Sequence, residues 1–384
     1  MPLTWPQVLA RRLTRHGLVD PVPKERLADQ VGVICGAHAQ VMSAAEVSIG
    51  LRVAGIDRSD VRSALWERRS LVKTFGPRGT VHVLDPRDLP AWNAVLAAAH
   101  QLPGFSPGVR LTADELDTVV AAIDGALGDA ADLTIDELDA EVVKRAGAWA
   151  GERVMPAFQE LWPRWRQAVS AAAYRGVLCF GPNRGRRTTY TGPRRWLGEA
   201  RAAVAADANQ ATRFVLRRYL HAYGPASAEH VARWLGASPA WAKQAFRLAG
   251  DELERVDVEG DELWQLAGDG AARAVKDTVR LLPYFDAYAV GSHPRERVYP
   301  GRASEQALAR TQAGNLPVLV VDGVVVGIWH QRRSGAKVAL TVEPFRRLTA
   351  AERRDLDAQV ERIGAIQEAA ATLTIGTVTA GPHA

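Results

Sequence analysis

Cysteine is scarce in this chain of 384 residues, which holds only Cys35 and Cys179. Two isolated thiols exclude a disulfide framework and suit a reducing compartment. No apolar run approaches the roughly 18 residues that a membrane span needs. The first fifteen residues lack the apolar core and cleavage site of a signal peptide. We therefore expect a cytoplasmic protein without a membrane association.

Lysine is also scarce, since most of the 48 basic residues are arginines. Against 43 acidic residues the formal net charge is +5, and the isoelectric point is about 9.4. The excess is concentrated between Arg184 and Arg218, where nine arginines face two acids. Arginine binds phosphate and base edges through its planar fork. This distribution favours a nucleic-acid partner, although a solvated basic face without a ligand gives the same pattern.

A pattern of helices followed by a strand–turn–strand occurs three times along the chain. In the first copy, Ser43 and Glu46 have the spacing of a capping box. The first copy ends in a hairpin at 71–84 with Arg78 at its tip. Its expected helices are 4–17, 24–36, 43–54 and 58–69.

The second copy places helices at 112–128, 134–147 and 156–174, with a capping box at Thr134 and Glu137. Its hairpin at 177–190 carries three arginines near the turn: Arg184, Arg186 and Arg187. The third copy places helices at about 207–223, 227–235 and 239–248, before a hairpin at 253–266. The turn at Glu259-Gly260 is a strong hairpin signal.

The last hundred residues have a different character. Segments 316–328 and 336–343 are rich in β-formers and enclose a basic turn with Arg332, Arg333 and Lys337. An amphipathic helix at 349–371 and a strand from Thr372 follow.

Helices that end in a hairpin have the order of a winged helix. We therefore expect a mainly α fold with β hairpins, made of three tandem winged-helix units and a C-terminal β-rich element. The predicted domains are 1–100, 101–195, 196–278 and 279–384.

His38 and Gln40 are the residues best suited to chemistry, because they lie one residue apart at a helix break. In an extended segment, side chains at i and i+2 point to the same side. Two polar groups aimed together can hold a water molecule. The alternative is a buried His and Gln that hydrogen-bond the backbone, and the spacing alone does not decide between them.

The run GAHAQVMSAAEVSIGLR at 36–52, named here the signature segment, resembles the corresponding segment of the winged-helix DNA glycosylases of the AlkZ and YcaQ superfamily. Members carry Gln-x-Gln or Gln-x-Asp there. The His-apolar-Gln variant resembles AlkZ-like proteins of Streptomyces and related actinobacteria. FGPRGTVHVL at 75–84, LLPYFDAYAVG at 281–291 and PVLVVDGVVVGIW at 317–329 extend the resemblance over nearly the whole chain.

The resemblance implies three winged helices around a DNA channel, and hydrolysis of the N-glycosidic bond of alkylated purines in double-stranded DNA. It assigns the catalytic role to His38 and Gln40. Antibiotic-resistance members of the family imply bulky N7-guanine adducts as substrates, for self-resistance or repair. We expect no cofactor, no metal and no required protein partner, and a location at the nucleoid.

Basic residues on the hairpins are the expected DNA contacts. They are Arg78, Arg184, Arg186, Arg187, Arg332, Arg333 and Lys337.

No lysine occurs between Glu25 and Val72, which argues against a Schiff base and for a monofunctional glycosylase without lyase activity. The alternative function is a winged-helix DNA-binding regulator without catalysis, which is a frequent role of this fold. A regulator would carry a polar recognition helix. In the third copy that helix offers only Lys243, Gln244 and Arg247. A catalytically inactive architectural binder is the third possibility.

Overall fold

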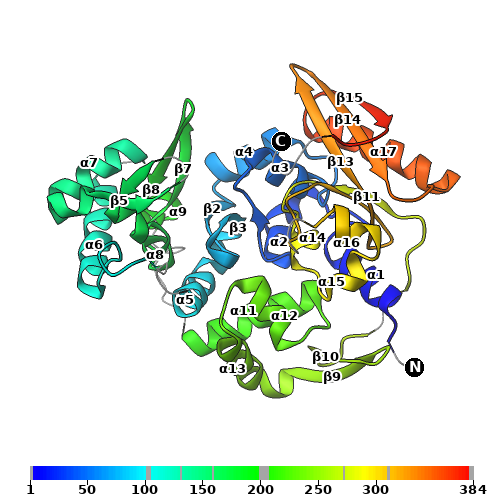
Figure 1. Cartoon of the computed structure of the whole chain (residues 1–384), viewed down its shortest axis with the longest axis horizontal. Helices are drawn as coiled ribbons and strands as arrows, with labels where there is room; N and C mark the ends of the chain where they lie inside the picture. The colour runs from blue at the N-terminus through cyan, green and yellow to red at the C-terminus, as the bar shows by residue number, and fades with distance from the viewer. Residues whose placement is uncertain are drawn as a thin grey trace. The chain divides into compact units, whose positions relative to one another are not determined.

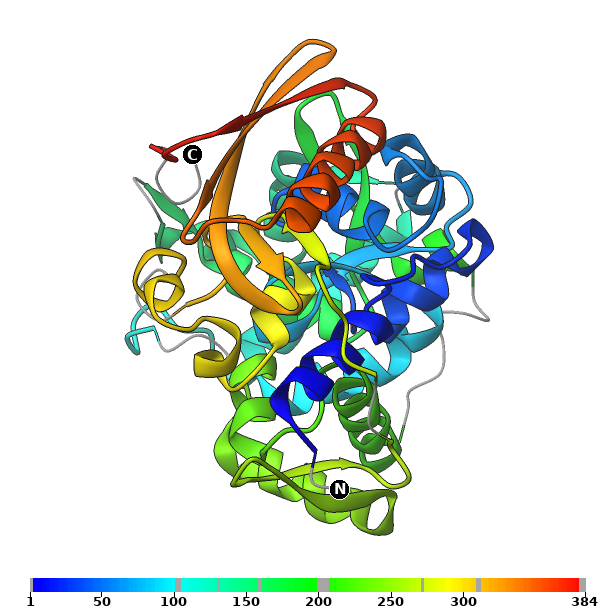
Figure 2. The same cartoon turned by 90° about the vertical axis from the view of Figure 1, so that its right-hand side faces the viewer.

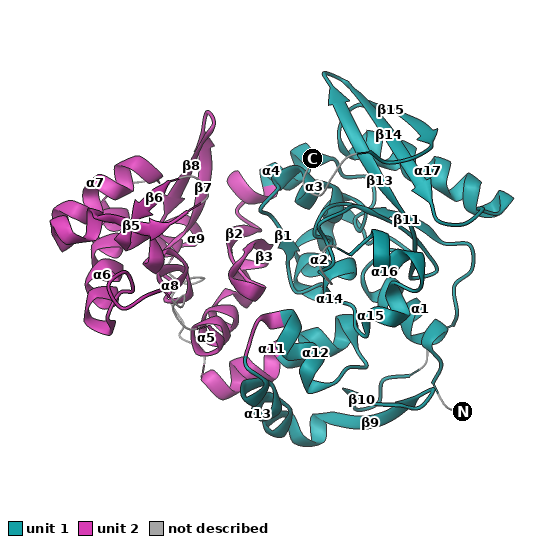
Figure 3. Ribbon diagram, viewed as in Figure 1, with its two compact units in different colours: residues 1–63, 216–234, 238–384 teal, residues 64–215, 235–237 magenta. Residues whose placement is uncertain are grey.

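The structure is a computed structural model that describes residues 3–100, 105–129, 132–157, 160–198, 207–270, 273–308 and 312–379. The chain forms two compact units (Figures 1 and 3). Unit 1 comprises residues 1–63, 216–234 and 238–384, and unit 2 comprises 64–215 and 235–237. Helices α4 (Arg58–Trp66) and α11 (Ala208–Tyr223) each continue from one unit into the other. The division into four domains is finer than this and stays a prediction.

Unit 1 is organised around a five-stranded sheet in the order β11-β12-β13-β14-β15. Neighbouring strands are antiparallel except β14 and β15, which run parallel and are joined by helix α17. The bounds are β11 Val279–Leu282, β12 Val318–Val321, β13 Val324–Ser334, β14 Lys337–Pro344, α17 Ala350–Ile366 and β15 Ala370–Ile375. This sheet confirms the expected C-terminal β-rich element and makes the fold as a whole mixed α/β, where the sequence predicted a mainly helical one.

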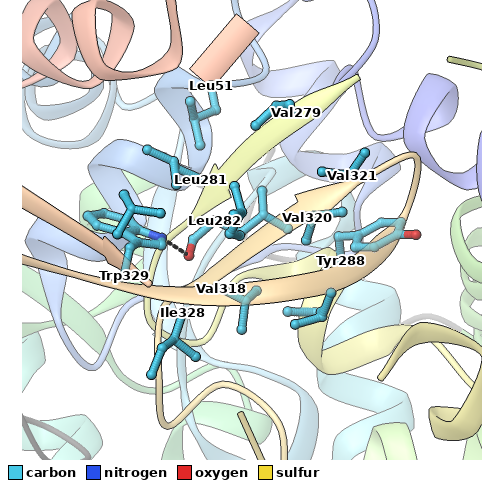
Figure 4. Packing of buried hydrophobic residues seen from close by; sticks show 14 of the residues in the cluster. Leu51, Val279, Leu281, Leu282, Tyr288, Val318, Val320, Val321, Ile328 and Trp329 are labelled. Carbon is cyan, nitrogen blue, oxygen red and sulfur yellow. Dashed lines mark hydrogen bonds between the residues drawn. The ribbon is translucent and has the colours of Figure 1, made fainter. Parts of the chain in front are cut away.

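The core of unit 1 joins this sheet to the start of the chain (Figure 4). All four residues of β12 are buried, as expected for a central strand covered on both faces. Helix α17 packs on the sheet, with Leu356 and Ile363 buried (Figure 2). Helices α1 (Trp5–Arg15) and α3 (Met42–Gly50) contribute Leu9, Leu13 and Val47 to the same cluster. The helix of the signature segment thus packs in the same core as the C-terminal sheet.

The hairpins of the three helical copies lie where the sequence predicts them. Helix α2 (Leu27–Val33), α3 and α4 precede β2 (Val72–Phe75) and β3 (Val81–Leu84). In unit 2, β7 (Cys179–Arg184) and β8 (Arg187–Thr191) follow α6 (Ala113–Asp129) and α7 (Ile135–Ala146). In unit 1, β9 (Leu253–Val258) and β10 (Asp261–Leu266) follow α12 (Ala228–Leu235) and α13 (Pro239–Ala249). The remaining helices are α5 Leu89–Ala99, α8 Val169–Tyr174, α9 Pro193–Leu197, α14 Ala287–Gly291, α15 Arg295–Val298 and α16 Arg302–Gln306.

The hairpin of the second copy pairs with a short third strand, and that of the third copy with a single residue. In unit 2, β4 (Leu133–Thr134) pairs with β8. In unit 1, Ala226 forms an isolated bridge with Trp264 of β10. Both central residues of the β9–β10 turn, Glu259 and Gly260, have positive φ, as a two-residue type I′ hairpin requires.

Several expected boundaries are wrong. The helix expected at 156–174 is replaced in its first half by strands β5 (Arg153–Pro156) and β6 (Leu161–Pro163), because Pro163 would break a helix interior. Thr134 and Glu137 form the expected capping box, whereas Ser43 lies inside α3 and Glu46 binds Arg62 instead. The helix expected at 349–371 ends at Ile366.

The C-terminal hairpin also differs from its prediction. The segment 316–328 is divided by a turn at Asp322-Gly323, and β13 then continues to Ser334. Arg332 and Arg333 therefore lie in a strand, and the turn is reduced to Gly335 and Ala336. In the part of the chain that the structure describes, no helix is long and apolar enough to cross a membrane.

Three histidines of unit 1 have lowered pKa values, so their protonated forms are disfavoured. Desolvation lowers the pKa of the fully buried His16 well below its usual value, with Arg52 as the next cause. Burial likewise lowers the pKa of His230 to about 4 and that of His293 to about 2. The last two rings stack with centroids 5.2 Å apart.

These shifts predict a loss of stability in mild acid. The unfolded chain titrates its histidines near pH 6.5, so below that pH it binds more protons than the folded chain. Above about pH 7 these histidines should not affect the free energy of unfolding. As the pH drops from 6.5 toward 5, the free energy of unfolding should fall by at most about 1.4 kcal/mol per pH unit for each histidine. Urea unfolding at several pH values measures this. The slope should be smaller in His293→Gln, and a flat profile between pH 7 and 5 would contradict it.

Candidate functional site

The signature segment begins at a tight turn after α2. Cys35 and Gly36 both have positive φ, 64° and 95°. The amide of Gly36 donates to the carbonyl of Val31 at 2.9 Å, which closes the end of the helix. Tyr223 donates its hydroxyl to the carbonyl of Ile34 at 2.8 Å, and this bond is buried. The chain therefore enters β1 (Ala37–His38) from a fixed direction.

His38 and Gln40 have different environments. His38 is 8% exposed, and its ring lies over that of Phe285 with centroids 4.4 Å apart and planes 32° apart. Gln40 is exposed in the bend before α3, beside Val41, which is 39% exposed. The strand stops at His38, so strand geometry does not hold both side chains on one side as the spacing suggested. One member of the pair is fixed in the protein and the other faces solvent.

Small residues let α3 approach α17 closely. A Cβ atom added at Gly50 would lie 2.8 Å from two carbons of Ile366. Arg362 of α17 donates to the carbonyls of Gly50 at 2.6 Å and of Val53 at 2.8 Å, which satisfies the end of α3. The contact explains the glycine at the end of α3.

A buried ion pair ties the signature segment to the loop after β11. Both guanidinium Nη atoms of Arg52 lie 2.8 Å from the two carboxylate oxygens of Asp286. Their side chains are 1% and 0% exposed. Ser48 donates its hydroxyl to the same carboxylate at 2.7 Å. Removing one partner of such a pair leaves an uncompensated buried charge and costs about 3–5 kcal/mol.

Asp286 also organises the chain that follows it. Its carboxylate accepts from the amide of Tyr288 at 2.9 Å and so caps α14. Tyr288 in turn donates its hydroxyl to the carbonyl of Gly323 at 2.8 Å. Phe285, directly before Asp286, is thereby held against His38. Arg52 and Phe285 were not predicted as site residues, although a charged residue directly after an apolar helix is a signal for a buried partner.

The arginines of the β7–β8 hairpin largely face acids of unit 2. Arg184 is paired with Glu137 and lies 3.3 Å from Asp132. The hydrogen bond from Arg184 is the main cause that lowers the pKa of Glu137 to about 2. Arg187 lies 3.7 Å from Asp136. These two predicted DNA contacts therefore have protein partners that DNA would have to replace.

Arg186 lies exposed in the turn between β7 and β8. Arg78 lies half-buried at the tip of the β2–β3 hairpin, with φ 60°.

The β13–β14 hairpin presents its cations on two faces. Arg333 lies opposite the buried Val338 and donates to the carbonyl of Gln367 at 2.9 Å, on the side of α17. Arg332 precedes Arg333 in β13, so its side chain lies on the opposite face of the sheet. Lys337 pairs with Ser334, which lies on the same face as Arg332 because the two are two residues apart. Arg332 and Lys337 therefore share the face opposite to Arg333. Both are exposed. Figure 2 shows this hairpin extending past α17.

The structure brings part of the predicted site together within one unit. His38, Gln40, Arg332, Arg333 and Lys337 all belong to unit 1. Arg78 and the three arginines of the β7–β8 hairpin belong to unit 2. Within the described ranges, no group of three or more His, Cys, Asp or Glu is placed to hold a metal ion.

Comparison with known proteins defines the class. The model of the AlkZ-like DNA glycosylase family matches residues 31–366, which include the signature segment and most of the C-terminal sheet. The chain belongs to this family.

Two comparisons concern the same bacterium, Streptomyces sahachiroi. Its interstrand DNA cross-link repair glycosylase is 35% identical over 338 residues, which cover 86% of this chain and 88% of that protein. The solved structure of the S. sahachiroi DNA glycosylase AlkZ superposes with a TM-score of 0.82 at 30% identity, covering 97% of this chain and 100% of that one.

Proposed function

We propose that this protein is a monofunctional DNA glycosylase that hydrolyses the N-glycosidic bond of bulky N7-alkylguanine adducts in duplex DNA. The observation that carries the proposal is the arrangement of the signature segment in a member of a glycosylase family: a fixed, ring-stacked His38 beside an exposed Gln40.

The proposed reaction requires few functional groups from the protein. Alkylation at N7 gives the guanine a positive charge, so the base leaves without being protonated. The protein must position a water molecule and stabilise the cationic character that develops on the sugar. A neutral imidazole accepts the proton of that water. An amide accepts and donates at once, so Gln40 orients the same water from the solvent side.

Bulky adducts fit the exposed setting of Gln40. A glycosylase for small lesions flips the base into a closed pocket. Gln40 and Val41 instead lie at the surface of unit 1. The S. sahachiroi relative is named for interstrand cross-link repair. By analogy we propose that natural-product adducts at N7 of guanine are the substrates, in self-resistance or repair at the nucleoid.

For the architecture, we propose three winged-helix units at 1–100, 101–195 and 196–278, followed by the C-terminal element at 279–384. The support is the order of helices and hairpins, with a short third strand in the second copy and an isolated bridge in the third. Base release is proposed to need no cofactor, metal ion or protein partner, and the absence of a lysine between Glu25 and Val72 supports the absence of lyase activity.

Replacing either member of the pair should slow base release. In single-turnover assays on duplex DNA with an N7-alkylguanine, His38→Ala should lower the rate constant by about 10²-fold, the usual cost of removing a positioned general base. Gln40→Ala should lower it less, because its role is orientation alone. Abasic sites revealed by alkali give the rate, and a DNA-binding titration should show nearly unchanged affinity for both variants.

The matched control is Gln306→Ala, which removes an exposed glutamine at the end of α16 and should leave the rate unchanged. Two folded variants that bind adducted DNA and release base at the parental rate would show that the pair is structural. A wild-type protein that binds DNA but releases no base would instead favour the non-catalytic regulator.

Exposed cations on the hairpins should contribute to DNA affinity in a salt-dependent way. Each phosphate contact releases counterions, so Arg186→Ala, Arg332→Ala and Lys337→Ala should each weaken duplex binding and reduce the slope of log Kd against log salt by about 1. Arg184→Ala should have a smaller effect, because Arg184 is already paired with Glu137.

Fluorescence anisotropy over a salt series measures these slopes. Arg354→Ala on the exposed side of α17 is the control and should leave the slope unchanged. Hairpin variants with the parental slope would exclude these residues from the DNA interface.

A further inference from the structure

We propose that Phe285 is a positioning residue that sets the orientation of the His38 imidazole for base release. The proposal rests on the proposed function of His38 and adds a residue from 247 positions farther along the chain, which the motif itself does not contain.

The first support is the stacking itself. The two ring centroids are 4.4 Å apart and the planes are tilted by 32°, within the range of favourable aromatic contacts. With 8% of its surface accessible, His38 presents only a small part of itself to a reactant. Because the stack covers one ring face, it fixes the plane of the imidazole, so that a reactant can approach only the edge or the other face of the ring.

The second support is a strained backbone at Phe285. Its φ is 54°, a left-handed conformation that is unfavourable for a bulky side chain. Such strain persists where the surroundings over-determine the conformation, and it is concentrated at functional sites. Here the surroundings are the Arg52–Asp286 ion pair on one side and Gly314 on the other. Phe285 donates its amide to the carbonyl of Gly314 at 2.9 Å.

Gly314 leaves the space that the phenylalanine ring occupies. A Cβ atom added there would lie 3.0 Å from Cδ1 of Phe285 and 3.1 Å from its Cα. Gly314 itself has φ 98°, which side chains rarely adopt. The close approach therefore depends on glycine at this position.

Two hydrogen bonds hold the loop that carries Phe285 in the core of unit 1, and Figure 4 shows the one between Trp329 and Leu282. Trp329 donates its indole N–H to the carbonyl of Leu282 at 2.9 Å, at the end of β11. Tyr288 is buried on the other side of the loop and bonded to Gly323. The loop 283–286 is thus held at both ends, and an imidazole stacked on it has little freedom to rotate out of its plane. A misplacement of about 1 Å at a catalytic group costs up to about 10²-fold in rate.

Two substitutions separate a positioning role from a packing role. Asparagine adopts the left-handed backbone readily but has no aromatic ring, and tyrosine keeps the ring. Asparagine at position 285 should tolerate the positive φ, so the backbone should be unchanged. Phe285→Asn should nevertheless slow single-turnover base release by about 10-fold or more at unchanged DNA affinity. Phe285→Tyr should retain most of the parental rate. An Asn variant at the parental rate, or a Tyr variant as slow as the Asn variant, would overturn the proposal.

The same variants should be made in the His38→Ala background. If Phe285 acts through His38, Phe285→Asn should cause no further loss there. A loss as large as in the parental background would show that Phe285 acts independently, and the proposal would be wrong.

A spectroscopic measurement keeps this result separate from the proposed function. The carbon-bound imidazole protons of His38 should be shifted by the ring current of Phe285 in the NMR spectrum, and the shift should disappear in Phe285→Asn and persist in Phe285→Tyr. Absence of the shift in the parental protein would overturn the stack. If His38→Ala keeps the parental rate, the catalytic role of His38 and this proposal both fail, whereas a slow His38→Ala with a fast Phe285→Asn rejects the positioning role alone.

Discussion

The buried ion pair between Arg52 and Asp286 is the interaction on which the arrangement of the site depends. Two charges removed from water are tolerated only when geometry and additional hydrogen bonds satisfy them. Both Nη atoms of Arg52 donate to the carboxylate of Asp286. The same carboxylate also accepts hydrogen bonds from the hydroxyl of Ser48 and the amide of Tyr288. The pair joins the signature helix to the loop after β11. It therefore fixes Phe285, and through it His38, relative to the C-terminal sheet.

The two members of the His-apolar-Gln pair consequently have unequal roles. His38 is buried and stacked, so its position belongs to the core of unit 1, whereas Gln40 is exposed and can adapt to what binds. A positively charged N7-alkylguanine needs little help to depart. The proposed function therefore requires one fixed proton acceptor and one adaptable amide to direct water at the sugar, and it does not require a closed base pocket.

Local features of the fold could be predicted from the sequence because their causes are local. The Glu259-Gly260 turn and the Thr134 capping box each depend on residues within a few positions of one another. The parallel pairing of β14 with β15 could not be predicted, because it depends on how α17 packs on the sheet. The Arg52–Asp286 pair joins residues 234 positions apart, so the pairing could not be predicted from local sequence. The one sequence feature that pointed to it is the charge of each residue in an apolar segment.

For the candidate site, the sequence predicted the residues but not their environments. His38 and Gln40 were identified from the motif, while the different exposure of the two follows from where β1 ends. Arg184 was predicted as a DNA contact from its place near the turn of a hairpin. Its pairing with Glu137 depends on the packing of the hairpin beside α7, which the local sequence does not report.

The measurement that tests the central claim most directly is a structure of this protein on duplex DNA that carries a cationic pyrrolidine in place of one deoxyribose, as a stable mimic of the developing sugar cation. The account predicts that the atom equivalent to the anomeric carbon lies about 3–3.5 Å from a water molecule bound by both His38 and Gln40. A pyrrolidine bound away from the signature segment, with no water shared by the two residues, would contradict it.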